Sequence, residues 1–285
     1  MIETPHDLHY EVRGSGPVLL VIPGGAGHPM GLDGLTDRLA DRFTVVTYDP
    51  LGLAHGRLGL PVEEQRVEAW SEGAHRVLGE VLPDGESGYV FATSAGAVPA
   101  LDLLARHPER LRHVVSHEPP VVRVLPDAAR QLAMFADVYD TCRAAGLKAA
   151  GARMTAGLEE RTPDALEPEA AEPGSQPLSA DEELSNPMAL FLTRVMPRFT
   201  SYTPDLAALT ALSPRLTFAA GTDSRGQLLH RTAAFTAELS GSGFVEFPGG
   251  HIGAITHPVE FAECLAECLA KAPPPDATPD VPLTT

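Results

Sequence analysis

A serine and a histidine in this sequence stand where they could carry out nucleophilic chemistry. Ser94 follows the apolar run 88–93 and precedes the small residues Ala95 and Gly96. This pattern predicts a strand, a tight turn and a helix, with Ser94 at the apex. A serine hydroxyl is a poor nucleophile unless it is held clear of its neighbours and close to a base. His251 ends the run Phe-Pro-Gly-Gly-His, and imidazole exchanges protons near neutral pH, so the pair predicts acyl transfer.

The elements that must hold these two residues can be predicted from hydrophobic patterning. Residues 18–22 are apolar throughout, which is typical of a strand in the middle of a sheet, whereas 8–13 alternate like an antiparallel edge strand. Ser94 and His251 each follow the carboxyl end of a predicted strand, where open α/β sheets bind their ligands. Further strands are predicted at 43–48, 111–120, 215–220 and 243–247, and helices at 32–42, 62–82, 128–145, 149–160, 228–239 and 258–270.

The segment Ala92-Thr-Ser-Ala-Gly96 resembles the G-x-S-x-G elbow of the α/β-hydrolase fold superfamily, with Ala92 in place of the first glycine. The order of serine, acid and histidine along the chain also resembles that of this family. A second family turn is only partly matched, because Leu51 stands where an arginine is common. The resemblance implies an α/β fold with a mostly parallel central sheet flanked by helices, and a helical lid inserted after the sixth strand.

The resemblance leaves two candidates for the acid of the triad. Asp223 follows the next-to-last strand, the usual family position, and Glu118 ends the strand beside the elbow strand, a position that some members use. We favour Asp223, because of its position and the short reach of aspartate, and keep Glu118 as the alternative. Outside catalysis, Asp223 would cap its turn and Glu118 would tether a loop.

Two backbone N–H groups are predicted to form an oxyanion hole. Ala95 follows Ser94 at the start of a helix, where N–H groups point at a developing negative charge. In the resembling family the loop after the first central strand supplies the second donor, which here is Gly25, with Ala26 close behind.

The chain divides by composition into a core and an insertion. Residues 1–120 and 201–271 are predicted to form the hydrolase core, and 121–200 a lid. Within the lid, residues 159–183 carry nine acidic side chains against one basic side chain, which predicts a flexible, solvated segment. The proline-rich residues 272–285 are predicted to be a disordered tail.

The composition of the chain indicates which partners, compartment and cofactors to expect. The formal net charge of −17 disfavours nucleic acid and anionic membranes, so we expect neither. Three cysteines without framework spacing favour a reducing compartment, and the N-terminus lacks a signal-peptide pattern, so we expect a cytoplasmic protein. His113 and His117 lie on a predicted strand and do not converge on one ion, so we expect no metal, and no cofactor.

These features favour a serine hydrolase that cleaves an ester or lactone of a small molecule. A perhydrolase or a cofactor-free lyase or oxygenase on the same framework is an alternative. A ligand-binding protein without catalytic activity is a further one, disfavoured because such a protein need not keep all three groups. The substrate and the oligomeric state are not predicted.

Overall fold

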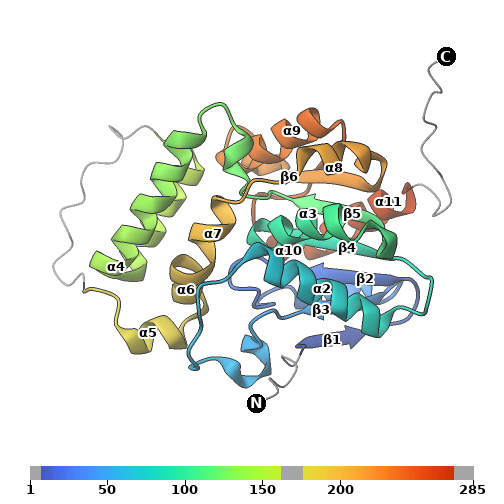
Figure 1. Ribbon diagram of the computed structural model, residues 1–285, viewed down its shortest axis with the longest axis horizontal. Helices are drawn as coiled ribbons and strands as arrows, with labels where there is room; N and C mark the ends of the chain where they lie inside the picture. Colours follow the sequence, from blue (N-terminus) through green and yellow to red (C-terminus); the bar gives the residue numbers. More distant parts are fainter. Residues whose placement is uncertain (1–7, 162–175, 273–285) are drawn as a thin grey trace.

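The computed structural model describes residues 8–161 and 176–272, and a sheet lies at its centre (Figure 1). Seven strands of the described chain run in the order β1-β3-β2-β4-β5-β6-β7. β1 is antiparallel to β3, and every other neighbouring pair is parallel. The strands are β1 Tyr10–Arg13, β2 Val18–Ile22, β3 Thr44–Tyr48, β4 Gly88–Thr93, β5 Leu111–His117, β6 Leu216–Gly221 and β7 Gly243–Phe247. The predicted mostly parallel sheet is therefore confirmed.

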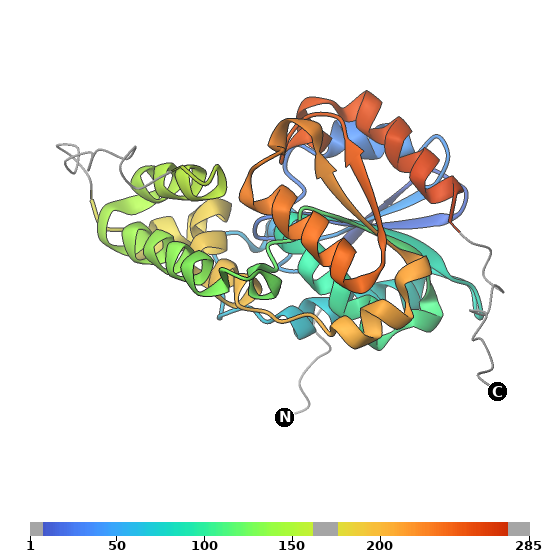
Figure 2. The same cartoon turned by 90° about the horizontal axis from the view of Figure 1, so that it is seen from above.

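Helices cover both faces of the sheet, which explains why its central strands are apolar on both sides. α1 (Asp33–Leu39) and α11 (Pro258–Ala270) bury their apolar residues against one face. α2 (Val67–Val81), α3 (Ala97–Arg106) and α9 (Leu228–Ser240) pack on the other. Figure 2 shows the two layers on opposite sides of the strands. Each parallel strand thus ends at one common edge, where loops can converge.

Some predicted boundaries were too generous. The helices expected at 32–42 and 62–82 are shorter in the structure, as α1 and α2. Residues 61–66 form no helix before α2, and the Gln65 N–H donates instead to Arg194 O in the lid at 2.7 Å. The other short helices of the core are α8 Leu206–Ala211 and α10 Gly253–Thr256.

The insertion between β5 and β6, residues 121–200, is called the lid below. β5 is the fifth strand in chain order, so the expected insertion after the sixth strand is wrong by one strand. α4 (Ala128–Leu158) breaks at Gly146, whose φ of 82° lies in the left-handed region, and its two halves run back along each other (Figure 2). The lid continues through α5 Ala180–Ser185, α6 Pro187–Leu190, η6 Phe191–Val195 and α7 Met196–Thr200.

One arginine of the core ties both ends of α4 together. Arg231 of α9 donates to Asp127 at 2.8 and 3.1 Å and to Glu160 at 2.7 and 3.1 Å. Asp127 precedes α4 and Glu160 follows it, so the folded-back helix begins and ends at this guanidinium. The Arg231 guanidinium is the main reason that the pKa of Asp127 lies below its usual range.

α7 anchors the end of the lid to the core. The Phe199 ring packs edge-on against Trp70 of α2, with centroids 4.8 Å apart. Both side chains are buried, and α7 also contacts the turn that starts at Ser94. The lid therefore lies beside the predicted nucleophile. The division of the chain into core and lid domains stays a prediction.

The acidic segment of the lid, residues 159–183, is not solvated along all of its described length. Residues 162–175 lie outside the described residues, as do 273–285 of the predicted tail. Glu183, however, is buried, and its carboxylate accepts from Arg143 and Arg194, each at 2.6 Å. It ties α5 to α4 and η6, so the expectation of a solvated segment is wrong at this residue.

No helix within residues 8–161 and 176–272 is long and apolar enough to cross a membrane.

Replacing Glu183 by alanine tests its packing role. Burial alone raises the pKa of Glu183, but Arg194 and Arg143 outweigh burial and hold it below the usual value. Loss of this partly buried ionic cluster should lower the free energy of unfolding by about 2 kcal/mol, measured by denaturant titration. Because the folded pKa is depressed, the contribution is complete above the unfolded pKa of about 4.3 and is lost as the pH falls through the folded pKa.

Its exposed neighbour gives the control. Glu182→Ala should leave stability within about 0.5 kcal/mol, because surface substitutions of this kind have small effects. Equal losses in Glu182→Ala and Glu183→Ala would show that the buried ion pairs do not stabilise the lid.

Candidate active site

Ser94 occupies a strained turn between β4 and α3. Its φ of 53° lies in the left-handed region, which non-glycine residues seldom adopt. Tight packing explains the small residues around it. A Cβ on Gly96 would lie 2.2 Å from Pro23 O, and one on Gly24 would lie 2.9 Å from the Ser94 Cβ. Glycines at both positions let the loop after β2 and the turn after β4 approach each other, and the predicted elbow is present.

His251 reaches this turn from the loop after β7. A hydrogen bond of 3.1 Å joins its Nε2 to Ser94 Oγ. Gly249 and Gly253 make the loop possible, since the φ of Gly249 is 79° and a Cβ on Gly253 would lie 2.3 Å from Pro248 O. The structure thus brings together the serine and the histidine that the sequence singled out.

The other imidazole nitrogen meets Glu118, which follows β5. His251 Nδ1 lies 2.6 Å from Glu118 Oε2, and the carboxylate is fully buried. An ionised carboxylate only accepts hydrogen bonds, so Nδ1 carries the proton and Nε2 is free to accept from the Ser94 hydroxyl. Glu118 has a φ of 48°, a second left-handed residue at this edge of the sheet.

The prediction that Asp223 orients His251 is wrong in this structure. Asp223 is exposed, and its backbone N–H bonds to Gly249 O at 3.0 Å. The turn after β6 therefore lies beside the histidine loop, but its carboxylate is not on the imidazole. The longer side chain of Glu118, turned by its left-handed backbone, fills the place instead. Sequence reasoning also missed Ser224, whose hydroxyl donates to Glu118 Oε1.

The comparisons with known proteins agree with this fold. The sequence profile of the alpha/beta hydrolase fold family matches residues 17–258. The chain belongs to the α/β hydrolase family.

Similar proteins include an uncharacterized hydrolase of Bacillus subtilis, YraK, 32% identical over 271 residues, 93% of each chain. Solved structures with the same fold include the following two examples. An esterase from Thermogutta terrifontis gives a TM-score of 0.67 at 18% identity, over 95% of this chain and 96% of that chain. An enol-lactonase from Burkholderia xenovorans gives a TM-score of 0.62 at 17% identity, over 93% of this chain and 96% of that chain. These similarities confirm the predicted fold and a hydrolase of this family.

The electrostatics of this α/β hydrolase keep Glu118 charged. Burial alone would raise the pKa of Glu118, but the hydrogen bond from His251, the charges of the nearby imidazoles and the hydrogen bond from Ser224 outweigh burial. Together they lower the pKa of Glu118 to about 2. A carboxylate ionised at all ordinary pH values can hold one imidazole tautomer and stabilise the imidazolium that forms when Ser94 loses its proton.

Gly25 and Ala95 remain the predicted oxyanion donors. Gly25 has a φ of 60°, and its turn is closed by the Gly27 N–H, which donates to Gly24 O at 3.0 Å. The Gly25 N–H is left outside that bond. Ala95 is the second residue of the helical turn Ser94–Gly96, and the first N–H groups of a helix have no partner within it.

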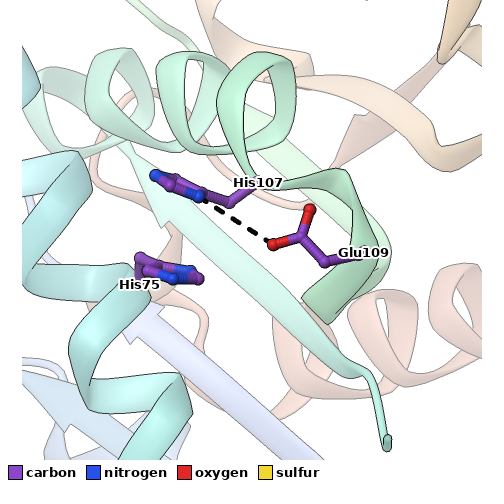
Figure 3. A group of neighbouring side chains, drawn as sticks. All are labelled: His75, His107 and Glu109. Atoms are coloured by element: carbon purple, nitrogen blue, oxygen red, sulfur yellow. Dashed lines mark ion pairs between the residues drawn. The ribbon is translucent and has the colours of Figure 1, made fainter.

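One cluster of metal-ligand residue types appears in the part of the chain that the structure describes: His75, His107 and Glu109 (Figure 3). It sits at the opposite end of α3 from Ser94. The two imidazoles stack with centroids 3.8 Å apart and planes 15° from parallel. Ring lone pairs lie in the ring plane, so they do not converge on one ion in this arrangement. The absence of a metal from the protein stays a prediction.

The contact between His251 and Glu118 predicts a proton signal. A short hydrogen bond to a carboxylate shifts the Nδ1 proton of an imidazole far downfield in one-dimensional proton NMR. This resonance should be present in the wild type, persist in Asp223→Asn and disappear in Glu118→Gln. Its loss in Asp223→Asn, with retention in Glu118→Gln, would assign the imidazole to Asp223.

Proposed function

We propose that this protein is a serine hydrolase that cleaves carboxylic esters, lactones included, of small molecules. Ser94 is the nucleophile, His251 the general base and acid, and Glu118 the acid of the triad. The observation that carries the proposal is the continuous hydrogen-bonded chain from Ser94 Oγ through both nitrogens of His251 to a buried carboxylate. The three residues come from the ends of β4, β7 and β5, so the fold itself fixes their geometry.

The first half of the reaction acylates the enzyme. As Ser94 Oγ attacks the ester carbonyl carbon, its proton passes to His251 Nε2, and the carbonyl oxygen becomes an oxyanion. The N–H groups of Gly25 and Ala95 stabilise this charge. The intermediate collapses, the carbon–oxygen bond of the leaving alcohol breaks, and the Nε2 proton passes to that alcohol. Ser94 then carries the acyl group.

The second half returns the enzyme to its starting state. Water gives a proton to His251 Nε2 as its oxygen attacks the acyl carbon, and the same N–H groups hold the new oxyanion. Collapse releases the acid and returns the proton to Ser94 Oγ. Glu118 stays ionised through both halves, so it holds the imidazole without itself taking the proton.

Ester chemistry is the simplest use of these groups, because the site supplies a nucleophile, a base and two predicted N–H donors. The esterase and enol-lactonase noted above share only the fold at their low identity, so their activities are their own. A cytoplasmic location, and the absence of nucleic acid or membrane as partners, stay predictions that rest on composition.

Ser94→Ala should abolish hydrolysis. With p-nitrophenyl acetate, p-nitrophenyl butyrate and γ-butyrolactone as a panel, kcat should fall by about 10⁴ to 10⁶, because no other group replaces the nucleophile. Ser242→Ala, at the far end of β7, is the matched control and should keep wild-type turnover. Near-normal turnover in Ser94→Ala would exclude the proposed mechanism, and inactivity of the wild type on the whole panel would exclude the proposed substrate class.

Glu118→Gln should lower kcat by about 10⁴, because an amide leaves the imidazole in the wrong tautomer. Asp223→Asn should lie within about threefold of the wild type, since an exposed carboxylate outside the chain of hydrogen bonds does not act on the imidazole. Both changes are nearly isosteric, and circular dichroism checks the fold. An exchange of the two phenotypes would assign the acid to Asp223.

A further inference from the structure

The Glu118 carboxylate is held on both of its oxygens. Oε2 meets His251, while Oε1 accepts from the Gly221 N–H at 2.9 Å and from the Ser224 hydroxyl. Ser224 is 1% exposed and Glu118 0%. The side chains of three separate loops, after β5, β6 and β7, thus form one hydrogen-bonded line, which is buried at Ser224 and Glu118 and partly exposed at His251.

We propose that Ser224 is a positioning residue of the active site: its hydroxyl fixes the Glu118 carboxylate so that Oε2 faces His251. The proposal rests on the proposed function for its effect on turnover, but its structural part is independent of any substrate. Ser94, His251, Glu118 and Ser224 then act as a unit of four residues, of which only the first two touch the substrate.

The hydroxyl of Ser224 has one hydrogen and two acceptors within reach. Besides Glu118, the backbone oxygen of Gly221 lies 2.9 Å away. Hydrogen bonds to an ionised acceptor are the stronger ones, so the hydrogen points at the carboxylate. The other Oε1 donor, the Gly221 N–H, belongs to the backbone. Within residues 8–161 and 176–272, Ser224 is therefore the one side chain that donates to this oxygen.

Glu118 needs such a partner more than an aspartate would. A glutamate has one more rotatable bond, and its carboxylate can turn away from the imidazole unless it is held. Glu118 also sits in a left-handed backbone conformation, anchored by its own N–H to Ala219 O at 2.9 Å. With the backbone fixed, the remaining freedom lies in the side chain, and Ser224 restricts it together with the Gly221 N–H.

The packing of β6 against the histidine loop brings Ser224 into place. A Cβ on Gly221 would lie 2.4 Å from Gly249 O and 2.6 Å from Gly250 C. Only a glycine lets the end of β6 approach the histidine loop this closely. The same close approach places Ser224 at Oε1 of Glu118 and His251 at Oε2.

Loss of the hydroxyl should change the protonation of the pair as well as its geometry. The titratable side chains that act on the Glu118 carboxylate are His251 and His117. His117 is fully buried, and burial lowers its pKa to about 4, so it stays neutral in the working range. With one donor fewer, the negative charge of the Glu118 carboxylate is no longer shared with Ser224 and favours the protonated imidazole more strongly, so the acid limb of kcat/KM should move to higher pH.

The test compares Ser224→Ala with Thr222→Ala, a control in the same turn whose side chain is exposed and whose hydroxyl makes only a long contact of 3.5 Å, to Gly249 O. Losing a hydrogen bond to a charged group should lower kcat about 10- to 100-fold, with KM changed less than about threefold. The downfield Nδ1 proton of His251 should weaken or shift. Thr222→Ala should match the wild type in each readout, and Ser224→Thr, which restores a hydroxyl, should recover part of kcat.

Turnover within twofold of the wild type, with an unmoved acid limb and an unchanged proton resonance, would overturn the proposal. If Ser224→Ala does not fold, Ser224→Cys replaces it, because a thiol keeps the volume and is a weak donor. The resonance also separates this inference from the proposed function. A protein that hydrolyses no ester yet loses the signal in Ser224→Ala supports the positioning role, while an active protein insensitive to the change refutes it.

Discussion

The hydrogen bond between the buried Glu118 carboxylate and His251 is the constraint on which the arrangement of this edge of the sheet depends. A carboxylate removed from water is costly unless each oxygen has donors, and here both oxygens have them. Meeting that requirement needs β5, β6 and β7 to end side by side, as their parallel pairing ensures. It also needs a left-handed backbone at Glu118, a conformation that only the surrounding contacts can hold.

The lid, too, is held in place by carboxylates that are paired with donors. Its folded-back helix is tied to the core by charges at Arg231, its middle is held by the buried Glu183, and its end packs through Phe199 on Trp70. Arginine–carboxylate pairs thus fix parts of this acidic insertion in place. The α7 end, next to Ser94, combines this aromatic packing with an ion pair between Arg198 and Glu64 at 2.9 Å.

The strands, helices and tight turns of this protein could be predicted from the sequence because they depend on local patterns. Strands apolar on both sides, glycines beside Ser94 and His251, and the break at Gly146 are each visible in a short window of residues. The nucleophile and the base could be predicted for the same reason, since each follows a strand and lies among small residues that permit a tight turn.

The acid could not be settled in this way. Asp223 and Glu118 both follow strands at the correct edge, and the choice depends on the backbone angle at Glu118 and on which loop faces the imidazole. Ser224 gives no signal of its own, because its partner lies 106 residues away in the sequence. The burial of Glu183 was equally invisible, since it depends on where Arg143 and Arg194 stand after the lid has folded.

The central claim is that Ser94, His251 and Glu118 form one catalytic unit facing two backbone donors. A crystal structure of the protein after reaction with an aryl phosphonate tests it most directly. The account predicts phosphorus bonded to Ser94 Oγ, a phosphonyl oxygen accepting from the N–H groups of Gly25 and Ala95, and Glu118 on His251 Nδ1. A phosphonate on another residue, an oxygen turned away from both N–H groups, or Asp223 on the imidazole would contradict it.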